Sequence, residues 1–432
     1  ADQWRASAFG YTGDPNARTP VIDALAAQSV DFRTAVSVCP VCTPYRAALM
    51  TGRYPVSTGM FLNDLYLPDG EVCLAESLQA AGYATGYIGK WHLDGHGRSA
   101  FIPPARRQGF DYWKAAECDH NYPKSHYYEG DSPERRNWEG YDAYAQTDDA
   151  RRYIAAHANG DRPFFLTVSY GTPHFPHGTA PDEFKVLLPP ESIRFPPNVP
   201  AEKIDDKLRR EAQGYYAHGM ALDRCVGRLL DALRESGIER DTILVFTSDH
   251  GEMMGSHGCP ACQKQVPWDE SILVPFLLRY PALHGAQGRI VRTPIVTPDI
   301  LPTLLSLAGV PVPPSVEGED VSALVRGGGP EDRAVLFMNV APFDNFSKGR
   351  EYRGVRTARH SYVRAIDGPW LLYDTAADPH QLRNLADDPA AADLRKELNA
   401  KLQAALKRVG DEFKPKAHYL AHHGYRVMAN GA

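Results

Sequence analysis

Residues 42–53 of this 432-residue chain read Cys-Thr-Pro-Tyr-Arg-Ala-Ala-Leu-Met-Thr-Gly-Arg, which sets a nucleophile and a cation four positions apart. The run from Arg46 is a good helix former and Pro44 lies near its start, so Cys42 is predicted at a helix N-terminus. Anions are stabilised at such an end, and Arg46 lies on the same helix face as Cys42. This spacing predicts a site that attacks or binds an anion.

The same stretch carries a family pattern. Proline two residues after Cys42 and arginine four residues after it, continued through Gly52 and Arg53, resemble the signature of the type I sulfatases. An isolated cysteine is more often a buried small hydrophobe, and the extended pattern favours a functional one. The resemblance implies that Cys42 is oxidised to formylglycine by the formylglycine-generating enzyme. Its hydrate would be the nucleophile, because the second hydroxyl can later expel the sulfate.

The run Gly-Lys-Trp-His-Leu at 89–93 places a cation beside a titratable ring. Lysine is a compact cation that suits a sulfate oxygen, and histidine moves protons near neutral pH. Standing alone, such a run would be a surface or packing feature. It resembles a second sulfatase motif, which implies that Lys90 binds the sulfate and His92 is the general base that expels it.

Two further segments resemble the metal-binding segments of the family. Residues 247–252 read Thr-Ser-Asp-His-Gly-Glu, and Asp-Gln stands at positions 2 and 3. Many sulfatases have Asp-Asp and asparagine here, whereas phosphonate monoester hydrolases and choline-sulfatase-like relatives have the glutamine and histidine of this chain. Oxygen ligands favour Ca²⁺, and the imidazole nitrogen admits Mn²⁺ or Zn²⁺. The ligands implied by the resemblance are Asp2, Gln3, Cys42, Asp249 and His250.

Several other polar residues complete the expected site. Residues 170–177 read Tyr-Gly-Thr-Pro-His-Phe-Pro-His, and the resemblance implies that His174 assists the leaving-group oxygen and that His177 nearby touches substrate. Lys264 matches the lysine that bridges sulfate and leaving group; a solvated loop lysine is the alternative. For His257, a structural role and a substrate contact remain open.

The segment 108–144 is rich in aromatic residues among Asp, His and Arg and matches no catalytic motif. Aromatic faces with polar neighbours suit sugar rings, so this segment, including Trp113, is predicted to form a substrate-binding wall that selects the leaving group. The alternative is a packed cap without ligand contact.

Continuous apolar runs at 163–170 and 241–248 are typical of strands buried on both faces of a parallel sheet, and residues 82–89 are predicted to form a further short buried strand. An amphipathic helix is predicted over 210–236. The pattern predicts an α/β fold with a mostly parallel central sheet sandwiched by helices, which the resemblance specifies as alkaline phosphatase-like. Ligands bind at the carboxyl ends of such strands, so the motifs should converge on one cleft.

The composition shifts near Gly327–Pro330. We therefore expect a catalytic domain at 1–328, a small C-terminal sheet-plus-helix subdomain at 329–412, and an extended tail at 413–432. Within the subdomain, short strands are predicted at 334–339, 352–356 and 362–365, and a helix over about 391–409. In relatives a short hydrophobic strand precedes the position of Ala1, so we expect such a strand ahead of it.

The hydrophobic content of 43% and charged content of 23% are those of a soluble globular protein, and no apolar run approaches membrane-spanning length. The net charge of −6 argues against nucleic-acid binding. Seven scattered cysteines argue against a dense disulfide framework. A zinc site at the pairs Cys39/Cys42 and Cys259/Cys262 is disfavoured, because Cys42 belongs to the longer pattern and no zinc-ribbon context surrounds either pair. For Cys259/Cys262, packing or a surface disulfide is favoured. The expected compartment is periplasmic or extracellular if a signal peptide has been removed, and cytoplasmic otherwise.

Together these motifs predict a sulfatase that hydrolyses a sulfate monoester, with a small sulfated sugar as the expected substrate. A phosphonate monoester or phosphodiester hydrolase with the same nucleophile is the first alternative, favoured by Gln3 and His250. An inactive homologue that binds sulfated glycans is the second.

Overall fold

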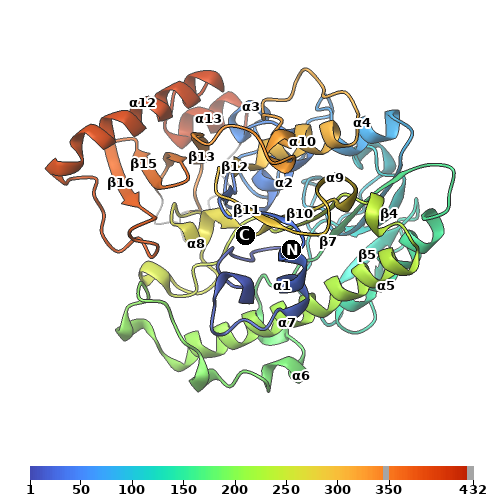
Figure 1. Ribbon diagram of the computed structural model, residues 1–432. Helices are drawn as coiled ribbons and strands as arrows, with labels where there is room; N and C mark the ends of the chain where they lie inside the picture. Colours follow the sequence, from blue (N-terminus) through green and yellow to red (C-terminus); the bar gives the residue numbers. More distant parts are fainter. Residues whose placement is uncertain (344–349, 426–432) are drawn as a thin grey trace.

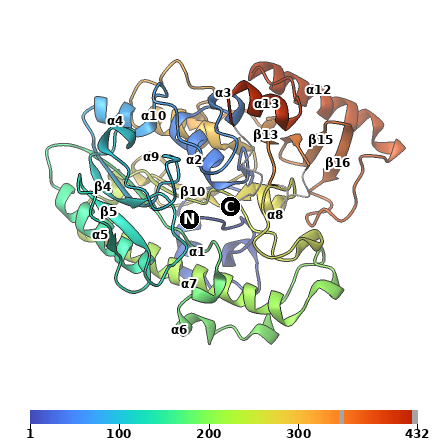
Figure 2. The same cartoon turned by 180° about the vertical axis from the view of Figure 1, so that it is seen from behind.

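The computed structural model describes residues 1–343 and 350–425 of the protein. Helices flank a set of central strands, and a separate small sheet lies at one side with the last helices of the chain (Figures 1 and 2). Within these two ranges, no helix combines the length and the apolar character needed to cross a membrane. The α/β class predicted from the sequence is confirmed.

The first central sheet has five strands in the order β6-β5-β4-β3-β7. Strand β3 (Ala84–Lys90) pairs in parallel with β4 (Tyr112–Ala116) and with β7 (Phe164–Ser169). Strands β5 (His126–Glu129) and β6 (Arg136–Asn137) extend the sheet in antiparallel fashion. The predicted runs at 82–89 and 163–170 are therefore neighbouring parallel strands.

A second sheet has the order β11-β1-β10-β8. Strand β10 (Phe276–Arg279) runs antiparallel to both β8 (Leu244–Thr247) and β1 (Val30–Phe32), whereas β11 (Arg289–Val291) is parallel to β1. The parallel pairs of the first sheet are thus the two that involve β3, whereas the second sheet, which ends at β8, mixes parallel and antiparallel pairs. A short sheet completes this side, with β2 (Ala35–Val36) between β12 (Ile295–Val296) and β9 (Leu273–Val274).

The first two residues of the chain lie between the continuations of β7 and β8. Ala1 N donates to Thr247 O at 2.9 Å, and Asp249 N donates to Ala1 O at 3.3 Å. On the other side, Asp2 N donates to Thr172 O at 3.2 Å, and Asp2 forms a parallel bridge with the next residue, Pro173. Asp2 is thereby fixed by backbone hydrogen bonds at the carboxyl ends of both strands.

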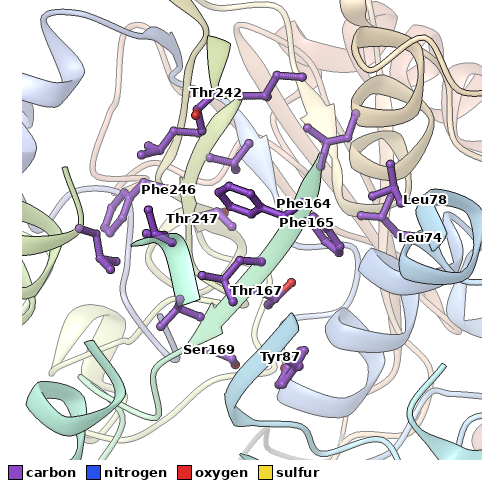
Figure 3. A pocket seen from close by; sticks show the side chains of 18 of the residues that line it. Leu74, Leu78, Tyr87, Phe164, Phe165, Thr167, Ser169, Thr242, Phe246 and Thr247 are labelled. Carbon is purple, nitrogen blue, oxygen red and sulfur yellow. The ribbon is translucent and has the colours of Figure 1, made fainter. Parts of the chain in front are cut away.

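A cavity of about 620 Å³ lies alongside β7 and β8, each of which is an edge strand among the described residues. Apolar side chains from both strands and from neighbouring helices line it (Figure 3). The residues labelled there include Leu74, Leu78, Phe164, Phe165 and Phe246. The strand expected ahead of Ala1 stays a prediction.

Long helices cover the strands. Helix α7 (Asp206–Glu235) begins where the Asp205 side chain accepts a hydrogen bond from Leu208 N, and it packs beside α5 (Asp142–His157) (Figure 1). The helix predicted over 210–236 is confirmed. The remaining α-helices of the catalytic part are α1 (Pro20–Ala26), α2 (Cys42–Thr51), α3 (Pro55–Thr58), α4 (Leu74–Ala80), α6 (Asp182–Lys185), α8 (Asp269–Ile272), α9 (Pro281–His284), α10 (Ile300–Leu307) and α11 (Ser322–Val325).

The C-terminal part holds an antiparallel sheet in the order β13-β14-β15-β16, with a helix packed on it. Its elements are β13 (Val335–Asn339), β14 (Tyr352–Arg356), β15 (His360–Ala365), β16 (Gly368–Asp374) and α12 (Ala392–Arg408). The three predicted strands and the predicted helix are all present, while β16 was not foreseen. The boundary at 328/329 stays a prediction.

The expectation of an extended tail is wrong for part of its length. Helix α13 (Lys416–His422) forms there, and the Tyr419 ring packs edge-on against Phe61 with centroids 6.1 Å apart. The Tyr419 hydroxyl also donates to Asp411. Contact with the catalytic part therefore orders this segment, which local composition does not reveal. Residues 426–432 of the predicted tail lie outside the described residues.

Candidate active site

Polar side chains from distant segments meet at the carboxyl ends of three strands. Lys90 is the last residue of β3, His174 follows β7, and Asp249 follows β8. Helix α2 begins at Cys42, as the sequence predicts, and its first turn is buried beside them. The expected convergence of separate motifs on one place is thus observed.

Cations and candidate metal ligands surround the Cys42 thiol. Its Sγ lies 3.5 Å from Lys90 Nζ and 3.8 Å from Lys264 Nζ. It also lies 3.5 Å from His250 Nε2 and 3.7 Å from Asp2 Oδ1. Although burial favours the neutral thiol, Lys264 and Lys90 hold the pKa of Cys42 well below its ordinary value. Position 42 therefore has the positive surroundings that an anionic substrate needs.

Arg46 connects the acidic side of the site to the strands. Its Nη2 lies 3.1 Å from Asp2 Oδ2 and 3.3 Å from Asp249 Oδ2. Its Nη1 donates to Lys90 O and to Ser169 Oγ, both at 2.8 Å. The planar guanidinium thus fixes two carboxylates and two strand ends at once. Ser169 was not foreseen, and the only signal for it is a polar residue that closes an apolar strand.

Four side chains form a group suited to a divalent cation: ligand atoms of Asp2, Cys42, Asp249 and His250 lie within 4.8 Å of one another. His250 Nδ1 lies 3.0 Å from Gly251 O, so this nitrogen carries the hydrogen and Nε2 keeps its lone pair toward the group. Burial and the charge of Asp2 raise the pKa of Asp249. A cation between the two carboxylates would relieve that repulsion, so these residues fit one.

Gln3 lies at the edge of this group. Its backbone N donates to Asp249 Oδ1 at 2.9 Å, and its Nε2 donates to Glu252 Oε2 at 2.6 Å and to Cys262 O at 3.2 Å. Its Oε1 accepts from Lys264 Nζ at 3.0 Å. The amide oxygen therefore already has one partner, and ligation through its second lone pair stays a prediction.

His174 and Lys264 form a buried pair. Lys264 Nζ lies 2.8 Å from His174 Nε2, and His174 Nδ1 lies 2.8 Å from Phe175 O. Burial and the neighbouring Lys264 lower the pKa of His174 to about 3. The ring is therefore neutral, with its hydrogen on Nδ1 and Nε2 accepting from the ammonium. His120, which was not foreseen, stacks on the same ring with centroids 4.4 Å apart.

His92 lies just beyond β3 with its side chain 2% exposed. Burial opposes its charged form, but Cys118, Asp64 and Cys42 together raise the pKa of His92 to about 9. Asp64 was not foreseen, because it lies in a loop with no repeating pattern.

Two predicted substrate contacts find other partners. His177 is fully buried and its Nδ1 lies 2.7 Å from Glu211 Oε2. His257 stacks on Trp268 with centroids 4.6 Å apart, and its Nε2 lies 3.2 Å from Asn198 Nδ2. These partners, Glu211 and Asn198, belong neither to the four candidate metal ligands nor to the cations around Cys42. Both histidines are packed in place by neighbours, which favours structural roles.

The predicted substrate contact of Trp113 is wrong. Trp113 is 1% exposed and packs against Tyr87 and Trp91, with ring centroids 5.5 Å and 5.3 Å away. Farther along the segment, Tyr127 stacks on Trp138 at 4.1 Å. Trp113 and Trp138 are thus buried in two different apolar clusters, so much of the aromatic segment is core. An aromatic-rich sequence does not show which way each ring faces.

Comparison with known proteins agrees with this geometry. The sequence model described as Sulfatase matches residues 1–310, and one described as the C-terminal part of N-sulphoglucosamine sulphohydrolase matches residues 255–408. The chain is 52% identical to the ulvan-active sulfatase of Formosa agariphila, over 98% of this chain and 83% of that protein. It is 29% identical to the endo-4-O-sulfatase of Bacteroides thetaiotaomicron, over 95% and 91% of the two chains.

A solved structure is also similar over nearly the whole chain. The crystal structure of the yidJ protein of Bacteroides fragilis superimposes with a TM-score of 0.87 at 30% identity, covering 97% of this chain and 96% of that one. The sequence and the fold both match sulfatases, and Cys42 lies among cations at the start of a helix. The chain belongs to the sulfatase family and is a sulfuric ester hydrolase.

Proposed function

We propose that the enzyme removes sulfate from a sulfated carbohydrate such as ulvan, with formylglycine at position 42 as nucleophile and a divalent cation beside it. The Formosa relative is named as active on ulvan, and the extent of identity favours the same polymer here. The observation that carries the proposal is the position of Cys42 at the start of α2, 3.5 and 3.8 Å from two ammonium groups.

The cation would be held by Asp2, Asp249, His250 and the oxidised residue 42, with Gln3 as a further ligand. Two carboxylates and an imidazole lone pair offer the donor atoms that Ca²⁺ accepts, and Mn²⁺ or Zn²⁺ would also fit the nitrogen. Such a cation supplies charge that activates an oxygen nucleophile and neutralises sulfate oxygens.

The basic residues have separate proposed tasks. Arg46 touches Asp2 and Asp249, so it positions the carboxylates. Lys90 Nζ and Lys264 Nζ lie 3.5 and 3.8 Å from Cys42 Sγ and would donate hydrogen bonds to sulfate oxygens. Because all three cations are buried, their charges act with little screening by water.

Departure of the alcohol would take place beside His174 and Lys264. These two side chains hydrogen-bond each other in the absence of substrate, and a leaving-group oxygen between them would accept from both. For that contact His174 must present a proton at Nε2, which Lys264 can supply through the existing hydrogen bond. His92 would then act as the base.

Digestion of the isolated enzyme tests the nucleophile directly. The tryptic peptide of residues 34–46 contains both Cys39 and Cys42, so fragment masses must assign the conversion of thiol to aldehyde to one of them. We expect it at Cys42, in protein made alongside a formylglycine-generating enzyme. Unmodified Cys42 in such protein would contradict the proposal and favour an inactive binding homologue.

Substrate comparison tests the reaction. Desulfated ulvan oligosaccharides and free sulfate are expected as products, with faster turnover of aryl sulfate than of aryl phosphonate or phosphodiester. Faster turnover of the phosphonate would contradict the proposal that the natural substrate is a sulfate ester.

A further inference from the structure

His92 is held by a carboxylate that no part of the proposed reaction uses. His92 Nε2 lies 2.9 Å from Asp64 Oδ1. A carboxylate accepts hydrogen bonds and cannot donate one when ionised, so Nε2 carries a hydrogen. In the neutral ring Nδ1 then keeps its lone pair.

The other ring nitrogen is ready to accept a proton. His92 Nδ1 is buried and has no hydrogen-bond partner in the described part of the chain. A buried acceptor without a partner costs free energy, so such atoms tend to occur where a ligand or reacting group completes the site. The His92 ring lies beside the Cys42 side chain, and the His92 backbone carbonyl accepts a hydrogen bond from Thr43, the residue after Cys42.

Asp64 is in turn fixed from outside. Arg98 Nε donates to Asp64 Oδ1 at 3.0 Å, and Arg98 Nη2 donates to Asp64 Oδ2 at 2.9 Å. This two-point contact holds the carboxylate in one plane. The row Arg98–Asp64–His92 thus runs from the exposed surface to the buried site, and each member orients the next.

The same loop is tied to the residue that follows the nucleophile. Thr43 Oγ1 donates to His92 O at 3.0 Å and accepts from Asp64 N at 3.3 Å. Thr43 N donates to Asn63 Oδ1 at 3.0 Å. One hydroxyl therefore links the backbone of the base, the backbone of its carboxylate partner and the start of α2 beside Cys42.

We propose that Asp64 is a positioning residue for His92: it fixes the ring with hydrogen on Nε2 and lone pair on Nδ1 directed to the reacting group at position 42. His92 would take one proton at Nδ1, while the Nε2 hydrogen stays in the bond to Asp64. The carboxylate then offsets the charge of the imidazolium, as in nucleophile–histidine–carboxylate triads. This inference rests on the proposed role of His92 as base.

The first test reads the ring directly and needs no turnover. Nitrogen NMR of protein labelled in its histidines is recorded at a pH where the ring is neutral, with the His92 signal assigned by loss in His92→Gln. It should show hydrogen on Nε2 and none on Nδ1 in the native enzyme. Asp64→Ala and the isosteric Asp64→Asn should lose this preference and give mixed tautomers. Asp69→Ala is the matched control, since Asp69 is 81% exposed and pairs with Arg106.

The second test is kinetic. Asp64→Ala should lower kcat roughly 10- to 100-fold, the usual effect of losing a carboxylate that orients a histidine. KM should stay nearly constant, because Asp64 is proposed to act through His92. Added formate should restore part of the rate. Arg98→Gln should give a smaller loss in the same direction.

Native tautomer and native kcat in both Asp64 variants would overturn the proposal. A tautomer that depends on Asp64 in an enzyme without sulfatase activity would instead contradict the proposed function, so the two failures are distinguishable. A loss of rate with unchanged tautomer, no formate rescue and a lower melting temperature would show that Asp64 only anchors its loop, which also overturns the proposal.

Discussion

Strands β7 and β8 have opposite surroundings at their carboxyl ends and along their lengths. At the ends, Arg46, Lys90 and Lys264 lie among two carboxylates and a cysteine, all in hydrogen-bond or ion-pair contact. Along the strands, apolar side chains border a cavity of about 620 Å³ (Figure 3). At the strand ends, closely spaced buried charges can act on a bound substrate. Along the strands, apolar side chains border empty space and lack packing partners there among the described residues. Changes at the ends should alter rates, and changes along the strands should alter stability.

Replacing the nucleophile should have the largest effect. Cys42→Ala is expected to lower sulfate ester hydrolysis by roughly 10⁴-fold or more, the scale typical when an enzyme nucleophile is lost. Cys39→Ala is the matched control, because Cys39 lies three residues away in the hydrophobic core and should affect melting rather than turnover. Residual activity in Cys42→Ala above a tenth of the native rate would contradict the expectation that changes at the strand ends alter rates.

Removing divalent cations should affect both rate and stability. A chelator is expected to abolish turnover and lower the melting temperature, and excess Ca²⁺ should restore both, since a ligand at 100 times its Kd contributes about 2.7 kcal/mol to folding. Asp249→Asn should remove the response to Ca²⁺ in calorimetry. Asp182→Asn, at a position 91% exposed, should keep it. If a chelator changes neither turnover nor melting temperature, the ion pairs with Arg46 and Lys90 alone would neutralise the carboxylates of the site.

Filling the cavity should change stability without changing the chemistry. Six or seven apolar residues fused ahead of Ala1 are expected to raise the melting temperature by a few degrees, because each large side chain that becomes buried contributes roughly 1.5–3 kcal/mol before the cost of ordering the strand. A Gly/Ser extension of equal length is the control. Slower amide exchange in β7 and β8 with only the apolar extension would locate the effect. Equal melting temperatures for the two extensions would show that the space does not take a strand.

A substitution in the aromatic core should give the smallest effect. Trp113→Phe is expected to cost about 1–2 kcal/mol of unfolding free energy and to leave KM unchanged, because the ring packs on Tyr87 and Trp91. Chemical denaturation and saturation kinetics measure both quantities. A raised KM with native stability would restore the interpretation of Trp113 as a substrate contact.

The predictable part of the site consists of residues with a local signal. Cys42 begins a helix that its own sequence predicts, Lys90 ends strand β3, and Asp249 lies two residues beyond the end of β8. Asp64 and His120 reach the site from loops, where tertiary contacts and not periodicity decide the direction of a side chain. The same reason explains the error at Trp113.

The helices and strands also differ in how strong a local sequence signal they have. Helix α7 and strands β3, β7 and β8 carry strong patterns and were predicted near their observed positions. Strand β16 was missed because its Gly-Pro start is typical of a turn, whereas its pairing with β15 comes from the sheet.

Helix α13 has a practical consequence for shortening the chain. Ending it at residue 412 would remove the Tyr419 ring from Phe61 and leave Asp411 with its partner Arg353 but without the tyrosine hydroxyl. Phe61 belongs to the same apolar cluster as β13 and α12, so truncation would expose surface shared by the early and late parts of the sequence. The two parts should therefore melt in a single cooperative transition, with the last helix acting as a clasp.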